Sequence, residues 1–139
     1  MCRVLVLAAL AVVAAGCGTS ATYDTDEVVH AFKRHGFALR NGYPFGSARE
    51  TVDAHDGDLL IPTRRSGADF IVLVISNAAA DDAWRAYESG QTPDSFDARR
   101  ANVMVISDTG LSTSHRRRVL GALSSLRSHG APVMVAGRK

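Results

Sequence analysis

The stretch that decides the fold is Phe70-Ile71-Val72-Leu73-Val74-Ile75, an unbroken apolar run rich in β-branched residues. Such a run is typical of a strand buried on both faces, so it predicts the central strand of a sheet. Asp58–Thr63 is a second apolar run, and the five-residue loop 64–68 separates it from Asp69–Ser76, the segment that contains the first run. Gly67 in this loop allows a positive φ. The two runs therefore predict a β-hairpin, whose first strand ends or lies at an edge at Pro62.

Three amphipathic segments surround this hairpin, and each predicts a helix. The first begins at Asp24 or Thr25 and ends at Gly36, the second begins at Asn77 and ends at Gly90, and the third runs from about Ser114 to Gly130. Their expected core-facing residues are Val28, Val29 and Phe32; then Ala80, Ala83, Trp84 and Tyr87; then Val119, Leu120, Leu123 and Leu126.

Three further segments predict short strands: Phe37–Arg40, Asn102–Ser107 and Pro132–Ala136. Gln91–Arg100 is polar and contains Pro93, so we expect a connector there. Tyr43–Asp58 is irregular and long for a connection inside a compact domain, and long loops are often functional.

A repeated sequence pattern suggests how the strands connect. Val72–Asn77 and Val103–Asp108 have similar sequences and each precedes a helical segment, about 30 residues apart, which is the length of a β-α-β unit. The connection would be right-handed if the two strands are parallel. A simpler explanation is that any buried strand feeding a helix has this pattern. Together the segments predict an α+β fold with a mixed sheet of about four to five strands and about three packed helices.

The N-terminus has the pattern of a secretory signal. Arg3 precedes the apolar run Val4–Ala15, and small residues follow. The run is shorter than the roughly 20 apolar residues that a transmembrane helix needs.

The end of this segment, Ala14-Ala15-Gly16-Cys17, resembles the lipobox of bacterial lipoproteins, with Ala14 where the family usually carries Leu. The resemblance implies cleavage before Cys17, diacylation of its thiol and anchoring on the extracytoplasmic face of the cell membrane or outer membrane. The chain would then comprise a signal peptide (1–16), a lipidated cysteine with a short tether (17–23) and one globular domain (24–139).

The alternative is an ordinary secreted protein cut near Ala15 or Gly16. Cys2 would leave with the signal, so Cys17 would remain as a lone thiol in an oxidising compartment, without a disulfide partner. Acylation removes that reactive thiol, which favours the lipoprotein interpretation. The tether Gly18–Tyr23 reaches at most about 20 Å, so the domain would sit close to the membrane.

Composition and motifs exclude several functions. The chain has 16 basic and 14 acidic residues, which gives no electrostatic reason to expect a nucleic-acid partner. The mature part is too short for most two-lobed solute-binding proteins. It has no GxSxG, GxxxxGK[ST], GxGxxG or HExxH motif, and one cysteine cannot form a zinc site of cysteine pairs. We therefore expect no cofactor and no metal.

Two weaker clusters have ordinary explanations. Asp53–Asp58 holds three carboxylates and a histidine but lacks the glycine and the glutamate of an EF-hand, so we expect a solvated acidic turn. Ser76 or Ser107 could join His115 and Asp108 in a Ser-His-Asp assembly, but no motif supports it. The histidines, such as His35 before Gly36, suit structural positions at helix ends.

The feature that suggests a surface role is Arg116-Arg117-Arg118. Three arginines in the early turns of a helix oppose its dipole, and cationic residues near anionic headgroups gain about 1 kcal/mol each. The triplet is therefore a candidate membrane or partner surface, if it faces the same side as the tether. The ordinary explanation is a solvated helix face.

These observations predict a lipid-anchored, non-enzymatic binding or interaction module of the cell envelope, with an envelope protein as its partner. The alternative is a small envelope hydrolase, which needs a nucleophile, a base and oxyanion donors converging in a pocket. A third interpretation, capture of a small ligand, needs a closed apolar pocket.

Overall fold

The computed structural model describes residues 22–42, 53, 56–90, 92–127 and 131–136. Within these ranges the helices are α1 (Thr25–Arg34), α3 (Asn77–Ser89) and α4 (Thr113–Ser125), with a single 3₁₀ turn, η1 (Arg64–Ser66). The strands are β1 (Leu39–Asn41), β2 (Asp58–Pro62), β3 (Ile71–Val74), β4 (Phe96–Arg100), β5 (Val103–Ser107) and β6 (Val133–Val135). No helix of this part of the chain has the length and apolar character to cross a bilayer.

The six strands form one sheet in the order β1-β2-β3-β5-β4-β6, and every neighbouring pair is antiparallel. The predicted α+β class is confirmed, and so is the β2–β3 hairpin, in which Gly67 has a φ of 63°. β2 ends at Pro62 as predicted. The sheet has one strand more than expected and no parallel pair.

The additional strand is β4, which lies in the segment predicted to be a polar connector. Its polar residues Asp97 and Arg99 are buried, at 3% and 6% exposure, on the face that α3 covers. Arg99 is held there by Asp81 of α3 at 2.6 Å and by the carbonyl oxygen of Ala101 at 2.6 Å. Phe96-Asp97-Ala98-Arg99 does alternate apolar and polar residues as a strand would, but the polar composition of residues 91–100 and the presence of Pro93 outweighed this short signal.

β4 also explains why β3 and β5 are not the parallel pair that a β-α-β unit would contain. β3 and β5 pair directly, but antiparallel, with Val72 opposite Val105. The chain leaves β3 through α3, enters β4, and reverses through a tight turn into β5. β3 and β4 therefore point the same way, with β5 between them. The right spacing for a β-α-β unit was present, but its second strand is β4.

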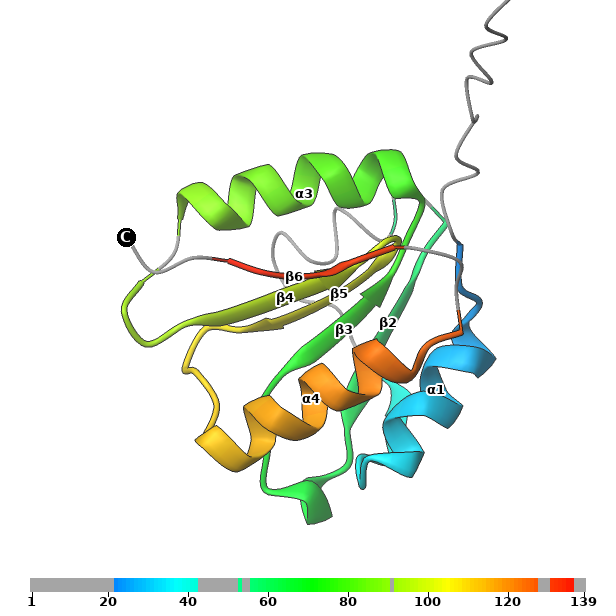
Figure 1. The fold of residues 1–139 in the computed structure, drawn as a ribbon, viewed down its shortest axis with the longest axis vertical. Coiled ribbons are helices and arrows are strands. Elements are labelled where there is room, and N and C mark those ends of the chain that lie inside the picture. The colour runs from blue at the N-terminus through cyan, green and yellow to red at the C-terminus, as the bar shows by residue number, and fades with distance from the viewer. Residues whose placement is uncertain (1–21, 43–52, 54–55, 91, 128–130, 137–139) are drawn as a thin grey trace, which may run out of the picture.

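The molecule has three layers (Figure 1). α3 covers one face of the sheet, and α1 and α4 pack side by side on the other. β3 supplies both faces, with Val72 and Val74 in the core under α1 and α4, and Leu73 and Ile75 in the core under α3. The prediction of a strand buried on both faces is thus confirmed.

The helices follow the predicted apolar stripes. Phe32, Trp84 and Leu123 lie in the two cores, each on a different helix. Two boundaries differ: Ser76, rather than Asn77, caps α3, and α4 ends at Ser125, ahead of Gly130, which lies outside the described residues.

Gly36 ends α1 as the sequence predicts, with a φ of 81°. Its N–H donates to the carbonyl of Lys33 at 3.0 Å, and the N–H of Phe37 donates to the carbonyl of Phe32 at 2.9 Å. This is a Schellman motif, and the two phenylalanine rings pack with centroids 6.2 Å apart.

Tyr23, which precedes the N-cap residue of α1, is hydrogen-bonded to a residue 79 positions later in the sequence. The side-chain amide of Asn102, in the β4–β5 turn, accepts from the N–H of Tyr23 at 2.8 Å and donates to its carbonyl at 2.9 Å. Both residues are about 2% exposed. The amide of Asn102 pairs with Tyr23 as a neighbouring strand would, and this fixes the backbone of Tyr23 against the β4–β5 turn.

Candidate binding groove between α1 and α4

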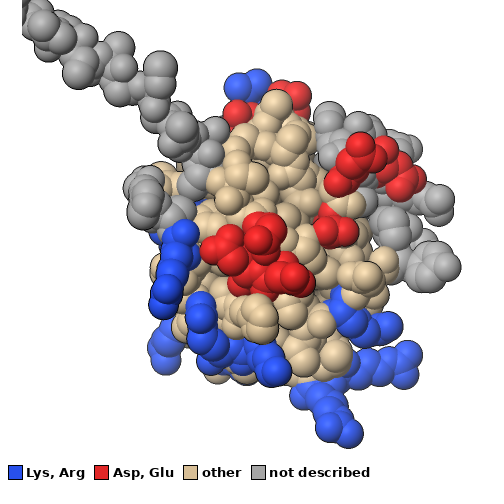
Figure 2. Space-filling model, turned by 90° about the vertical axis from the view of Figure 1, so that its right-hand side faces the viewer, with Lys and Arg blue, Asp and Glu red and all other residues tan. Residues whose placement is uncertain are grey.

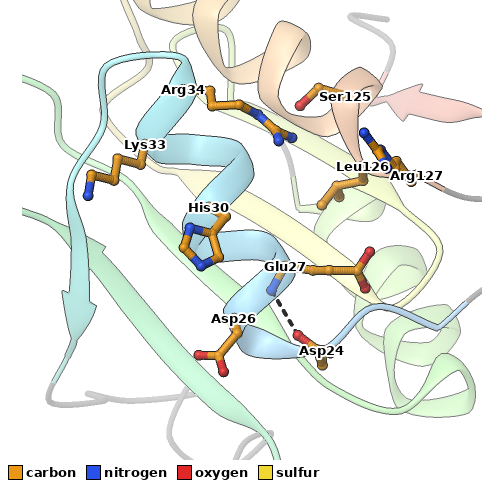
Figure 3. Close-up of a pocket in the computed structure, with 9 residues that line it drawn as sticks. All are labelled: Asp24, Asp26, Glu27, His30, Lys33, Arg34, Ser125, Leu126 and Arg127. Carbon is orange, nitrogen blue, oxygen red and sulfur yellow. Dashed lines mark hydrogen bonds between the residues drawn. The ribbon is translucent and has the colours of Figure 1, made fainter.

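A groove of about 730 Å³ lies between α1 and the C-terminal end of α4. It lies on the outer side of the α1–α4 layer and is open to solvent (Figure 3). Its lining residues are Asp24, Asp26, Glu27, His30, Lys33, Arg34, Ser125, Leu126 and Arg127. It is not the closed apolar pocket that capture of a small apolar ligand would need.

Helical periodicity places the α1 residues on this surface. Glu27, His30 and Arg34 recur at three- and four-residue spacing on the exposed side of the helix, opposite Val28 and Phe32 in the core. On the other side of the groove Leu126 is the C-cap of α4, with an extended backbone (ψ 123°) and a buried side chain. Arg127 therefore leaves the helix axis, and its exposed side chain borders the groove.

Charge is segregated along the groove. Asp24, Asp26 and Glu27 lie at its start, and Lys33, Arg34 and Arg127 lie at the other end. Figure 2, which shows the α1 side of the molecule, has acidic side chains gathered in the middle of this face and basic side chains mainly below them. None of these six side chains forms an ion pair with another described residue.

The arginine triplet at the start of α4 occupies three different environments. Arg116 donates to the carbonyl of Leu111 at 2.9 Å and stacks on Phe96, 5.5 Å from the ring centroid. Arg118 donates to the carbonyls of His35 and Gly36 at 2.7 and 2.6 Å and stacks on Phe37. Only Arg117 is exposed.

This arrangement bears on the membrane interpretation of the triplet. Arg118 lies at the C-terminal end of α1, whereas the chain enters at Tyr23, before the N-terminal end. A ten-residue helix is about 15 Å long, so the triplet and the entry point lie at opposite ends of α1. The condition that the triplet face the same side as Gly18–Tyr23 has no support from this geometry; Cys17 and residues 18–21 lie outside the described residues.

The proposed Ser-His-Asp combination is not assembled in the described part of the chain. The Ser76 hydroxyl caps α3, accepting from the N–H of Ala79 at 3.3 Å. The buried Ser107 hydroxyl lies 2.7 Å from the carbonyl of Asp69, to which it donates. His115 packs beside Phe37 instead, with ring centroids 5.9 Å apart.

The acidic turn is described only in part, because residues 54 and 55 lie outside the described residues. Asp53 and Asp56 are exposed, and Asp58 begins β2 and accepts a hydrogen bond from the Thr25 hydroxyl. Where the chain is described, no three His, Cys, Asp or Glu side chains gather closely enough to hold a metal ion. Residues 43–52 of the irregular segment also lie outside the described ranges.

Comparison of the chain with models of protein families, with curated proteins and with solved structures finds no match. The candidate site therefore rests on its own geometry.

The groove itself was not predicted. Its residues come from two segments about 90 positions apart, and in the sequence they have the pattern of ordinary solvated helix faces. The one available signal was the charge gradient along 24–34, acidic first and basic last, which also suits a helix dipole.

Proposed function

We propose that this chain is a lipid-anchored binding or interaction module of the bacterial cell envelope, held by Cys17 on the extracytoplasmic face, whose ligand site is the α1–α4 groove. The lipobox-like Ala14-Ala15-Gly16-Cys17 supports the anchor. The groove supports binding, because its volume lies within the range of about 300–1,000 Å³ that is usual for ligand sites.

The observation that carries the proposal is the set of unpaired charges around the groove. Where this fold uses charge for structure, the charged group has close partners: the guanidinium of Arg99 lies 2.6 Å from the carboxylate of Asp81, and that of Arg118 donates to two backbone carbonyls. The groove instead gathers carboxylates and cations that form no ion pairs among the described residues. Charges left unpaired in this way are available to a bound molecule.

The position of the groove suits an anchored protein. Asp24, which borders the groove, directly follows the fixed residue Tyr23. Gly18–Tyr23 reaches at most about 20 Å. A molecule bound in the groove would therefore be held within a short distance of the bilayer, as expected of a module that retains an envelope component near the membrane.

The hydrolase alternative receives no comparable support. In the one combination considered from the sequence, the hydroxyls of Ser76 and Ser107 are engaged with backbone groups, and His115 is placed beside an aromatic ring. A binding function requires none of these residues to act as a nucleophile or a base.

The anchor is tested by replacing Cys17 with Ala and labelling growing cells with an alkyne fatty acid. We expect the label and the cleavage of the signal to be lost, because the thiol is the group that is acylated. Cys2→Ala is the matched control, since it also removes a cysteine but should keep both. Continued labelling of the Cys17→Ala protein would rule out the proposed anchor.

The groove is tested in intact cells with a photo-crosslinking amino acid at position 30, which replaces His30 in the groove. The control position is Arg85, which is also exposed but lies on α3, on the opposite side of the sheet. We expect a discrete adduct from position 30 and none from position 85. The same adducts from both positions, or none from either, would contradict a binding role for the groove.

A further inference from the structure

We infer that the α1–α4 groove takes a short zwitterionic peptide, with its carboxylate against Arg34 and Arg127 and its ammonium group against Asp24 and Glu27. The inference rests on the proposed function and gives the groove a ligand class. It is argued from the two charged ends of the groove, from their separation, and from how this charge pattern compares with the other helices.

The basic end is built from two separate elements. Arg34 is the last residue of α1, and Arg127 follows the end of α4. Figure 3 shows both side chains on the same side of the groove, above Leu126 and Glu27. Two guanidinium groups that border one space repel each other, and a carboxylate between them replaces that repulsion with charge-assisted, bidentate hydrogen bonds.

The carboxylates at the acidic end of the groove are not fully used by hydrogen bonds within the fold. One oxygen of Asp24 accepts from the N–H of Glu27 at 2.8 Å, as the N-cap of α1. The side chain of Glu27 extends toward the α4 side of the groove (Figure 3). Neither carboxylate is in an ion pair with a described residue, so both can receive an ammonium group.

The separation of the two ends sets the size of the ligand. Glu27 and Arg34 are seven positions apart, which is about 10 Å along a helix axis. An extended peptide advances about 3.3–3.6 Å per residue, so a chain of three to four residues spans that distance between its terminal charges. A single amino acid, whose two charges sit on one carbon, cannot reach both ends.

Helix-dipole complementarity does not account for the whole pattern. Acidic first turns and basic last turns do stabilise helices, and α1 has both. However, α3 and α4 have neither an acidic first turn nor a basic last turn. Among the described helices the pattern is therefore confined to α1, and Arg127 adds a third cation to the groove from outside that helix.

The test is calorimetry with the full-length protein, purified from membranes in a non-ionic detergent. The probes are tetra-alanine with free ends, its C-terminal amide and its N-acetyl form. We expect the free peptide to bind at least about fivefold more tightly than either blocked form, which corresponds to one exposed ion pair of about 1 kcal/mol. Arg127→Gln should weaken binding of the free peptide by a similar factor and leave binding of the amide unchanged.

Arg85→Gln, on α3, is the matched control and should bind all three peptides as the wild type does. Equal affinity for the free and blocked peptides, or no binding at about 1 mM, would overturn the ligand class. If position 30 still crosslinks to an envelope component in that case, the groove remains a binding site and only the peptide is wrong. Competition by vesicles of anionic lipid, without peptide binding, would assign the groove to a headgroup and also overturn the inference.

Discussion

Arginine side chains close the C-terminal ends of two helices in this molecule. Arg118 donates to the carbonyls of His35 and Gly36 after α1. Arg100 donates to the carbonyls of Leu123 and Ser124 at the end of α4, each at 2.7 Å. The last carbonyls of a helix lack partners within the helix and carry its negative dipole end, so a guanidinium group satisfies both.

Arg118→Met should lower the free energy of unfolding by about 1–3 kcal/mol, because it removes two charge-assisted hydrogen bonds and the contact with the Phe37 ring. Met keeps an apolar stem of similar length. Arg117→Met is the matched control, since Arg117 is exposed, and should change stability by less than about 0.5 kcal/mol. Urea denaturation measures both variants, and equal effects would show that Arg118 does not stabilise the end of α1.

The arginine triplet also shows that the contacts of individual side chains cannot be predicted from the sequence alone. Three identical neighbours have the pattern of one cationic patch, but successive residues on a helix point about 100° apart. Arg116 and Arg118 consequently reach different backbone carbonyls, and Arg117 alone faces solvent. The acceptors, such as the carbonyl of His35, belong to segments whose positions only the fold determines.

At the scale of elements, strands with continuous apolar runs were predictable and the strand with buried charge was not. β3 and β5 have sequences that are stable only when both faces are covered, and the structure places them side by side in the centre of the sheet. In β4 the buried Arg99 pairs with Asp81 of α3, a contact that forms only when α3 is in place. Local sequence carries no sign of that pairing, so the strand and the direction of β5 were missed together.

Leu73→Ala should lower the free energy of unfolding by about 2–5 kcal/mol, because Leu73 is fully buried between β3 and α3 and its removal leaves a cavity. Val135→Ala, in the edge strand β6 where the side chain is 47% exposed, is the control and should cost less than about 1 kcal/mol. A chemical melt in which Leu73→Ala changes stability by only a few tenths of a kcal/mol would show that β3 is not the stability centre.

At the scale of the whole molecule, the structure separates the arginine triplet from Tyr23, because the two lie at opposite ends of α1. With Arg116 and Arg118 engaged internally, one guanidinium group remains for an anionic membrane, and each is worth about 1 kcal/mol at low salt. The candidate groove was also unpredictable from local sequence. α1 and α4 lie side by side because both pack on the sheet, and most of its strands lie between the two helices in the sequence.

Arg117→Ser should therefore reduce binding of the full-length protein to anionic vesicles at low salt by no more than about fivefold. Co-sedimentation with anionic and with neutral vesicles measures this, and the difference should vanish near 1 M salt, where the Debye length is about 3 Å. Replacing all three arginines is a poorer test, because it also disturbs the end of α1. A much larger loss for Arg117→Ser would restore the triplet region as a membrane-facing surface.

The pairing of Tyr23 with Asn102 has a consequence for the order in which the chain can fold. The two residues are 79 positions apart, and α1 also needs α4, near the end of the chain, to cover its apolar stripe. A chain that emerges N-terminus first must keep Val28 and Phe32 uncovered until most of its length has followed. Contacts of such long range form late and slowly. We therefore expect the first helix to be the last to dock, and to be the segment that a chaperone protects in the nascent protein.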